Sequence, residues 1–92
     1  MAKASARHIL VDSEAKCLEI KKKIAEGADF ADMAKKHSSC PSGRSGGALG
    51  SFTPGQMVPE FDRVVFKEAV GVVHGPVKTQ FGFHLVEITS RT

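Results

Sequence analysis

Hydrophobic and polar positions change their spacing early in the chain, which separates a predicted strand from a predicted helix. Residues 6–11 form a short run with two β-branched side chains and end at polar residues, a pattern typical of a strand. Three apolar residues then recur at helical spacing, namely Cys17, Ile20 and Ile24. We therefore predict a helix over residues 14–26, with Ser13 as its N-cap and Gly27 as its end.

A second helical pattern follows almost at once, with Asp29 as the expected N-cap. Its apolar stripe recurs at the spacing i, i+3, i+4, i+7 and consists of Phe30, Met33, Ala34 and His37. Residues 38–47 are rich in Ser and Gly, so we predict a long loop that holds neither helix nor strand. A loop of this length in so small a protein usually has a function.

The second half of the chain predicts three strands and one helix. Residues 48–53 form a short strand, and a helix begins at Pro59 and ends near Gly71. Residues 72–78 form a strand that a Gly-Pro pair interrupts, which suits the edge of a sheet. Residues 83–89 form the last strand.

The order of these elements favours an α+β domain with a small, mainly antiparallel sheet, because helices do not alternate regularly with strands. The chain has no repeat, linker or internal boundary, so we expect residues 1–92 to form a single domain. Met1 and Ala2 come directly before the first predicted strand. This start leads us to expect a stand-alone domain without a partner-binding module or targeting extension.

Composition excludes several classes of protein. With 92 residues, 41% of them hydrophobic, the chain can close one modest core. No apolar run approaches the roughly 18 residues that span a bilayer, and no signal-peptide pattern is present. Two cysteines are too few for a disulfide-rich scaffold, so we expect two thiols in a reducing compartment. These features predict a cytoplasmic protein without a membrane partner, and a monomer is the default expectation.

Electrostatics do not favour a nucleic-acid partner. The sequence pI is near 9.1, but the formal net charge is only +3. Trp and Tyr are absent, and the basic residues are not interleaved with aromatic side chains that could stack on bases. We therefore expect no nucleic-acid binding.

Two histidines lie on apolar faces of predicted strands. Period-2 alternation places His8 on one face with Ala6 and Leu10, and it places His84 on one face with Val86 and Ile88. If the two strands pair, the imidazoles could meet in the interior. Buried polar groups need hydrogen-bond partners, so each histidine could simply be a satisfied core residue, and the residues alone leave that interpretation open.

Cys40, in the long loop, is a second candidate for chemistry. It could be a nucleophile, a metal ligand or an inert side chain. With His8, His37 and His84 it could supply four metal ligands, but no paired Cys-x-x-Cys motif supports a metal site. A cysteine hydrolase is chemically possible, although nothing in the sequence identifies an oxyanion hole. We expect no metal.

Four large apolar residues lie near the loops: Leu49, Met57, Phe61 and Phe81. They could all belong to the core. Met57 lies between two turn-forming segments, however, and apolar residues at such junctions often line ligand pockets.

Four strings of residues, taken together, resemble the parvulin family of peptidyl-prolyl cis/trans isomerases. The strings are His-Ile-Leu-Val at 8–11, Gly-Gly-Ala-Leu-Gly-Ser-Phe at 46–52, Gly-Gln-Met-Val-Pro-Glu-Phe at 55–61 and Thr-Gln-Phe-Gly-Phe-His at 79–84. They occur in the family's order and spacing, with a Cys-Pro pair at the expected place before the glycines. The resemblance covers essentially the whole chain.

The resemblance implies a four-stranded antiparallel sheet wrapped by about four helices, as in the FKBP-like superfold. It also implies isomerase activity that assists protein folding, without a cofactor or a covalent intermediate. Residues that match the family's catalytic positions are His8, Cys40, Thr79 and His84. Residues that match its proline-binding pocket are Leu49, Met57, Phe61 and Phe81.

One branch of this family requires a phosphorylated residue before proline and reads the phosphate with a basic loop after the first strand. Here that connection is only Asp12-Ser13, so the resemblance implies no phosphate requirement. The expected partners are proline-containing peptides and unfolded or nascent proteins, with an apolar residue before the proline. The alternative is a non-catalytic module or chaperone that uses the same cleft.

Overall fold

The computed structural model describes residues 3–92, except for the side chain of Ser42. Met1 and Ala2, expected to lead directly into the first strand, lie outside the described residues. The elements in chain order are β1 (Ala4–Val11), α1 (Glu14–Ala25), α2 (Phe30–His37), the 3-10 helix η1 (Pro41–Ser45), β2 (Ala48–Phe52), α3 (Pro59–Lys67), β3 (Val73–Thr79) and β4 (Gly82–Arg91).

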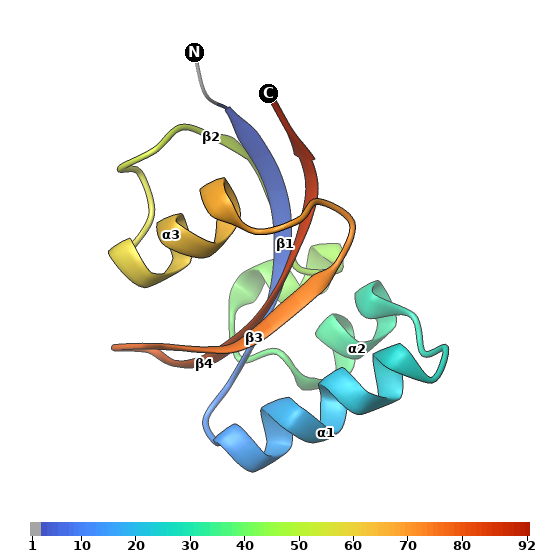
Figure 1. Ribbon diagram of the computed structural model, residues 1–92. Coiled ribbons are helices and arrows are strands. Elements are labelled where there is room, and N and C mark those ends of the chain that lie inside the picture. The colour runs from blue at the N-terminus through green and yellow to red at the C-terminus, as the bar shows by residue number, and fades with distance from the viewer. Residues whose placement is uncertain (1–2) are drawn as a thin grey trace.

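The strands form one four-stranded sheet in the order β2-β1-β4-β3, with every neighbouring pair antiparallel. Helix α3 covers one face of this sheet, and α1 and α2 cover the other (Figure 1). This arrangement confirms the α+β class and the antiparallel sheet. The Gly75–Pro76 pair lies in β3 at the sheet edge, where the pairing with β4 is irregular between His74 and Val77.

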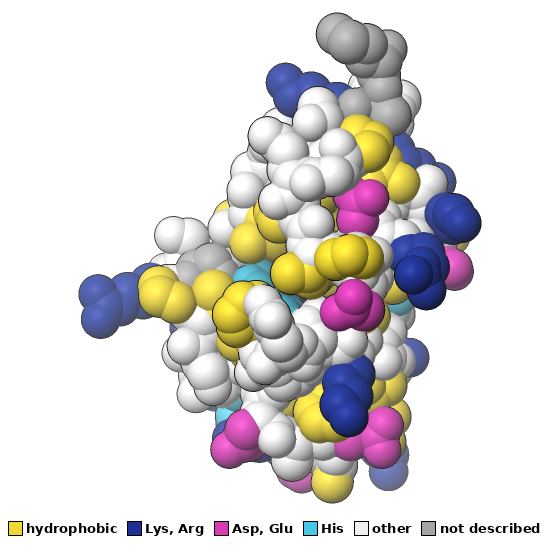
Figure 2. Space-filling model, turned by 90° about the vertical axis from the view of Figure 1, so that its left-hand side faces the viewer, with side chains coloured by type: hydrophobic (Ala, Val, Ile, Leu, Met, Phe, Trp, Pro, Cys, Tyr) yellow, Lys and Arg dark blue, Asp and Glu magenta, His cyan; other side chains and the backbone are white. Residues whose placement is uncertain are grey.

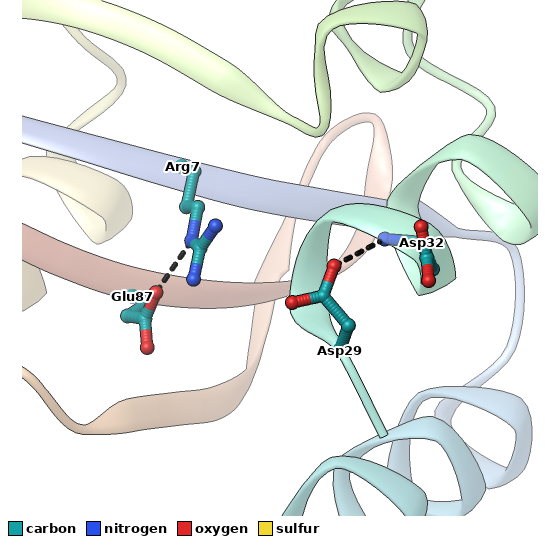
Figure 3. Close-up of polar contacts among 4 residues, drawn as sticks. All are labelled: Arg7, Asp29, Asp32 and Glu87. Atoms are coloured by element: carbon teal, nitrogen blue, oxygen red, sulfur yellow. Dashed lines mark hydrogen bonds and ion pairs between the residues drawn. The ribbon is translucent and has the colours of Figure 1, made fainter. Parts of the chain in front are cut away.

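The helix ends follow local side-chain chemistry. The Lys16 N–H donates to the Ser13 hydroxyl at 3.2 Å, which caps α1 as expected. Gly27, with φ near +115°, reverses the chain after α1, a conformation that glycine adopts without a Cβ clash. At the start of α2, the Asp32 N–H donates to the Asp29 carboxylate at 3.1 Å (Figure 3).

The face under α1 and α2 carries the first hydrophobic core. Its buried residues are Ile9, Val11, Cys17, Ile20, Phe30, Met33, Ala34 and Leu85. Arg7 of β1 lies at its margin, pairs with Glu87 of β4 (Figure 3) and stacks its guanidinium 4.8 Å from the Phe30 ring centroid. Burial raises the pKa of the Cys17 thiol to about 11, so Cys17 is a packing residue and not a nucleophile.

The face under α3 carries the second core. Its buried residues are Ala4, Ala6, Phe52, Phe61, Val65 and Val86. His8 and His84 lie on this same face of the sheet. His8 shares it with Ala6, and His84 shares it with Val86, because side chains on one strand change face at every residue. None of the helices in the described part of the chain has the length and apolar character that crossing a membrane requires.

Three details of the prediction are wrong. Residues 3–92 contain three α-helices, not about four, and the loop over 38–47 is not free of helix, because η1 forms inside it. Short-range bonds hold η1, since the Gly43 N–H donates to the Cys40 carbonyl at 2.9 Å and the Gly46 N–H to the Gly43 carbonyl at 3.0 Å. Helix α3 ends at Lys67, because Gly71 belongs to the next turn, where its N–H donates to the Ile88 carbonyl.

Candidate active site

The two histidines meet at the centre of the sheet. His8 comes from β1 and His84 from β4, and these strands are neighbours. Their Nδ1 atoms are 3.0 Å apart, and their rings are nearly parallel, with an interplanar angle of 15°. His8 is 6% exposed and His84 is 4% exposed. The two strands pair, and the hypothesis that the imidazoles could then meet in the interior is confirmed.

Thr79 extends this pair into a hydrogen-bonded chain. Its Oγ1 lies 2.7 Å from His84 Nε2, and the Phe81 N–H donates to the same oxygen at 3.2 Å. If Thr79 donates to His84 Nε2, then His84 Nδ1 carries a proton and donates to His8 Nδ1. In the opposite order His8 donates to His84, and His84 donates to Thr79. Both orders use two neutral rings, so the chain is satisfied without any charge.

Burial keeps both rings neutral. Burial, together with a smaller contribution from the repulsion of a charged His84, lowers the pKa of His8 from 6.5 to about 4. Burial also lowers the pKa of His84. At neutral pH the pair therefore bears no charge. A neutral, hydrogen-bonded pair is suited to holding the floor of a site in one geometry.

Phe61, from α3, packs edge-on against both imidazoles. Its ring centroid lies 5.7 Å from that of His8 and 5.9 Å from that of His84, with interplanar angles of 85° and 81°. Edge-to-face contacts of this kind are a preferred geometry for aromatic rings. Phe61 is 3% exposed and also belongs to the α3-side core, so it joins the site to the fold.

A cleft of about 360 Å³ opens over this floor. Figure 2 shows this face of the molecule, where hydrophobic side chains gather around a histidine near the middle. Seven of the eight predicted site residues line the cleft: His8, Cys40, Leu49, Met57, Phe61, Phe81 and His84. The eighth, Thr79, bonds to His84. The structure thus brings all eight together, and their individual roles in catalysis stay predictions.

The rim and the floor of the cleft differ in exposure. Phe81 is 63% exposed, whereas Phe61 is buried, and Leu49 and Met57 are half-buried between these limits. Cys40 is also half-buried, and its thiol is not part of a disulfide. The cleft therefore offers an open, apolar entrance above a fixed floor, in a volume typical of small-ligand sites.

Four lining residues were missed by the sequence analysis: Leu10, Ser39, Pro41 and Val58. Leu10 shares the face of His8, which was a usable signal. The others are chain neighbours of predicted residues. Backbone bonds hold this wall, because the Leu10 N–H donates to the Ser38 hydroxyl at 3.1 Å and the Ser39 N–H donates to the Leu10 carbonyl at 2.7 Å.

The metal alternative has no geometric support. Within residues 3–92, no group of three His, Cys, Asp or Glu side chains is placed to hold a metal ion. His8, His37, Cys40 and His84 therefore do not form a ligand set, even though their spacing in the sequence allows one.

This chain is similar to a known protein family and to curated proteins that contain it. Residues 3–90 match the family described as Rotamase, PPIC-type PPIase domain. The chain is 48% identical over 88 residues to the foldase protein PrsA of Exiguobacterium sibiricum, a match that covers 94% of this chain and 29% of the relative. Across the first curated relatives it matches, the chain spans about a third of their length.

Solved structures agree with this assignment. The crystal structure of the peptidylprolyl isomerase PrsA from Bacillus anthracis superposes with a TM-score of 0.95 at 38% identity, covering 99% of this chain and 42% of that one. The solution structure of NmPin, the parvulin of Nitrosopumilus maritimus, superposes with a TM-score of 0.87 at 36% identity. That match covers 98% of both chains.

Proposed function

This chain belongs to the PPIC-type peptidyl-prolyl isomerase, or parvulin, family, and we propose that its apolar cleft is where an X–Pro bond of the substrate rotates. A domain of this family is an enzyme that isomerises prolyl bonds and so assists folding. The observation that supports the cleft is the placement of a neutral, buried histidine pair and Phe61 beneath an apolar cavity of about 360 Å³.

The required acceleration is modest. The barrier to rotation about a prolyl bond is ~20 kcal/mol, and the uncatalysed reaction takes tens of seconds. Turnover at ~10 to 1,000 per second needs ~10³- to 10⁵-fold acceleration, or roughly 4–7 kcal/mol of transition-state stabilisation. No bond breaks, so this chemistry demands neither a cofactor nor a covalent intermediate.

The first contribution comes from the apolar walls. Met57, Phe61 and Phe81 hold the proline ring and exclude water from the amide beside it. The planar amide is more charge-separated than the twisted one, so a dry site destabilises the ground state more than the transition state. Binding that favours both states equally would not raise the turnover rate.

The second contribution comes from the polar wall. Cys40 lines the cleft together with His8, and its sulfur presents an electron-rich surface to the rotating imide. The histidines act as positioning residues, because their low pKa values keep them neutral and their ring nitrogens bond to each other and to Thr79. In this mechanism Cys40 forms no covalent bond to the substrate.

The preferred substrate has an apolar residue before proline and needs no phosphate. Strand β1 ends at Val11 and α1 begins at Glu14, so the connection that could hold a basic phosphate-binding loop is only two residues long. The exposed ring of Phe81 at the rim adds apolar surface for the residue next to the proline. Unfolded or nascent proteins supply such segments, and the relatives named as foldases support this substrate class.

Exchange NMR on a short peptide with Leu before Pro tests the proposal. The expected result is exchange between cis and trans that becomes faster in proportion to the protein concentration. Binding without faster exchange would instead favour the alternative, a non-catalytic proline-binding or chaperone module.

We also propose that the protein acts in the cytoplasm as a monomer. The thiols of Cys17 and Cys40, neither of them in a disulfide, support a reducing compartment. Cell fractionation tests the compartment, and light scattering of the purified protein at several concentrations tests the monomer. Recovery outside the cytoplasm, or a mass that rises with concentration, would contradict the respective proposal.

A further inference from the structure

A second cavity lies next to the proline cleft and has the opposite chemistry. Its volume is also about 360 Å³, but charged and hydroxyl side chains line it. We call it the basic cavity and define it by Lys35, Ser38, Ser39 and Arg44. None of these four residues was a predicted site residue, and the mechanism above does not use their side chains.

The two cavities share one wall. Ser39, Cys40 and Pro41 line both of them, so they form a narrow ridge between the proline cleft and the basic cavity. An extended peptide advances ~3.3–3.6 Å per residue. A substrate whose proline lies in the cleft therefore reaches across this ridge within a few residues.

The whole net charge of the chain comes from the segment around the basic cavity. Residues 33–59 contain Lys35, Lys36 and Arg44 and no Asp or Glu, whereas the rest of the chain has ten basic and ten acidic residues. Lys35 lies in the last turn of α2, where a cation complements the helix dipole. That role does not explain Arg44, which comes from η1.

Neither cation is neutralised within the described part of the chain. No acidic side chain of residues 3–92 forms an ion pair with Lys35 or Arg44, and both side chains are exposed at the cavity. Ser38 Oγ accepts from two backbone N–H groups, those of Leu10 and Cys40, so its own hydrogen is left to donate. The cavity thus offers positive charge and a hydroxyl donor.

Close packing fixes the position of η1 against α2. A Cβ on Gly43 would lie 2.9 Å from the Ala34 carbonyl oxygen and 3.0 Å from Ser38 Cβ, so only glycine fits there without a shift. Arg44 follows directly on this contact, and Lys35 follows directly on Ala34. The two cations are therefore attached to backbone segments that hold each other in place.

We propose that the basic cavity binds the carboxylate of an Asp or Glu that lies two or three residues from the substrate proline. The inference rests on the proposed function, since it needs the proline to occupy the neighbouring cleft. The domain would then select proline segments that carry an acidic residue near the proline, in addition to the apolar residue before it. A phosphate offers similar oxygen atoms, so the test includes it as a separate arm.

The test compares matched peptides by exchange NMR at low salt. Each peptide keeps Leu before Pro and carries Gln, Glu or phosphoserine at one of the positions two or three residues to either side of the proline. We expect Glu to lower KM about two- to fivefold relative to Gln at one of these positions, a size typical of exposed ion pairs. The difference should shrink in 0.5 M salt, because exposed charges are screened.

Paired charge variants locate the effect. In the double variant Lys35→Gln/Arg44→Gln, the Glu preference should vanish while kcat/KM for the Gln peptide is unchanged. The control, Lys16→Gln/Lys22→Gln, removes the same charge from exposed positions on α1 and should keep the preference. Thermal unfolding of both variants checks that they are folded.

The outcomes separate the inference from the proposed function. Equal KM values for Glu and Gln at every position, with the Gln peptide still isomerised, would overturn the inference alone. A gain restricted to phosphoserine would overturn the carboxylate assignment, and loss of preference in the α1 control would indicate general charge steering instead. Absence of catalysis with every peptide would overturn the proposed function itself.

Discussion

Lowering the pH from 7 to 5 should destabilise this fold through its histidine pair. The free imidazole of an unfolded chain takes up a proton below pH 6.5, whereas His8 in the folded protein does so only below about 4. Between these values the unfolded state binds more protons than the folded state. Stability is therefore fully present above pH 6.5 and is lost as the pH falls toward 4.

The shift of His8 sets the size of the effect. A change from 6.5 to about 4 corresponds to a loss of about 2 kcal/mol in the free energy of unfolding at pH 5 and about 3 kcal/mol at pH 4. The pKa of His84 is lowered in the same direction and adds to the loss. For a domain of this size, about 2 kcal/mol lowers the Tm by roughly 8–16 °C.

Urea unfolding followed by circular dichroism at pH 7, 6, 5 and 4.5 measures this loss. The variant His37→Gln, which changes a half-buried histidine outside the pair, should show the same dependence on pH as the unchanged protein. NMR titration of the ring nitrogens identifies the groups directly. A free energy of unfolding that stays flat from pH 7 to 5, or a His8 titration midpoint near 6.5, would refute the reasoning.

Three further predictions concern single residues. Cys40→Ala should reduce kcat/KM about 10- to 100-fold and leave measurable isomerisation. Mass spectrometry should detect no acyl-thiol in the unchanged protein, and a trapped acyl-thiol would indicate nucleophilic chemistry. Phe61→Ala should raise KM and also lower stability by about 3 kcal/mol, because Phe61 is buried in the core, whereas the exposed Phe81→Ala should raise KM with little change in Tm. His8→Ala should lower both the stability and the isomerisation rate, because it leaves the Nδ1 of His84 without its His8 partner. Urea unfolding and exchange NMR measure the two effects, and a fully stable but inactive variant would point instead to direct proton transfer.

The sequence predicted the elements well where side chains act locally. Ser13 and Asp29 cap their helices through their own side chains, and alternation placed His8 and His84 each on an apolar face of its own strand. The sequence-based prediction was wrong where the local structure depends on packing against another element. The short η1 helix forms in a Ser- and Gly-rich segment, where short-range backbone bonds hold it and Gly43 fits closely against α2, a contact that no local pattern encodes.

The candidate site likewise has one part that the sequence predicted and one part that only the folded structure shows. The family resemblance identified seven residues that line the cleft, but it gave no signal for the basic cavity behind the Ser39–Pro41 ridge. That cavity depends on how η1 lies against the end of α2. Lys35 and Arg44 are nine positions apart in the sequence, and only the folded chain places both at one cavity. Residue spacing cannot reveal such a site, although the lack of acidic residues over 33–59 was visible in the sequence.

Stability and activity are coupled in this domain because one core serves both. The α3-side core is small, and Phe61 contacts Phe52 within it while packing edge-on against both imidazoles. The same ring therefore contributes hydrophobic burial and fixes the floor of the cleft. None of the buried residues of the core under α1 and α2 lines the proline cleft, so that core does not form the floor of the cleft. Substitutions in the core under α1 and α2 should therefore change stability with little direct effect on turnover, whereas substitutions at Phe61 cannot separate the two.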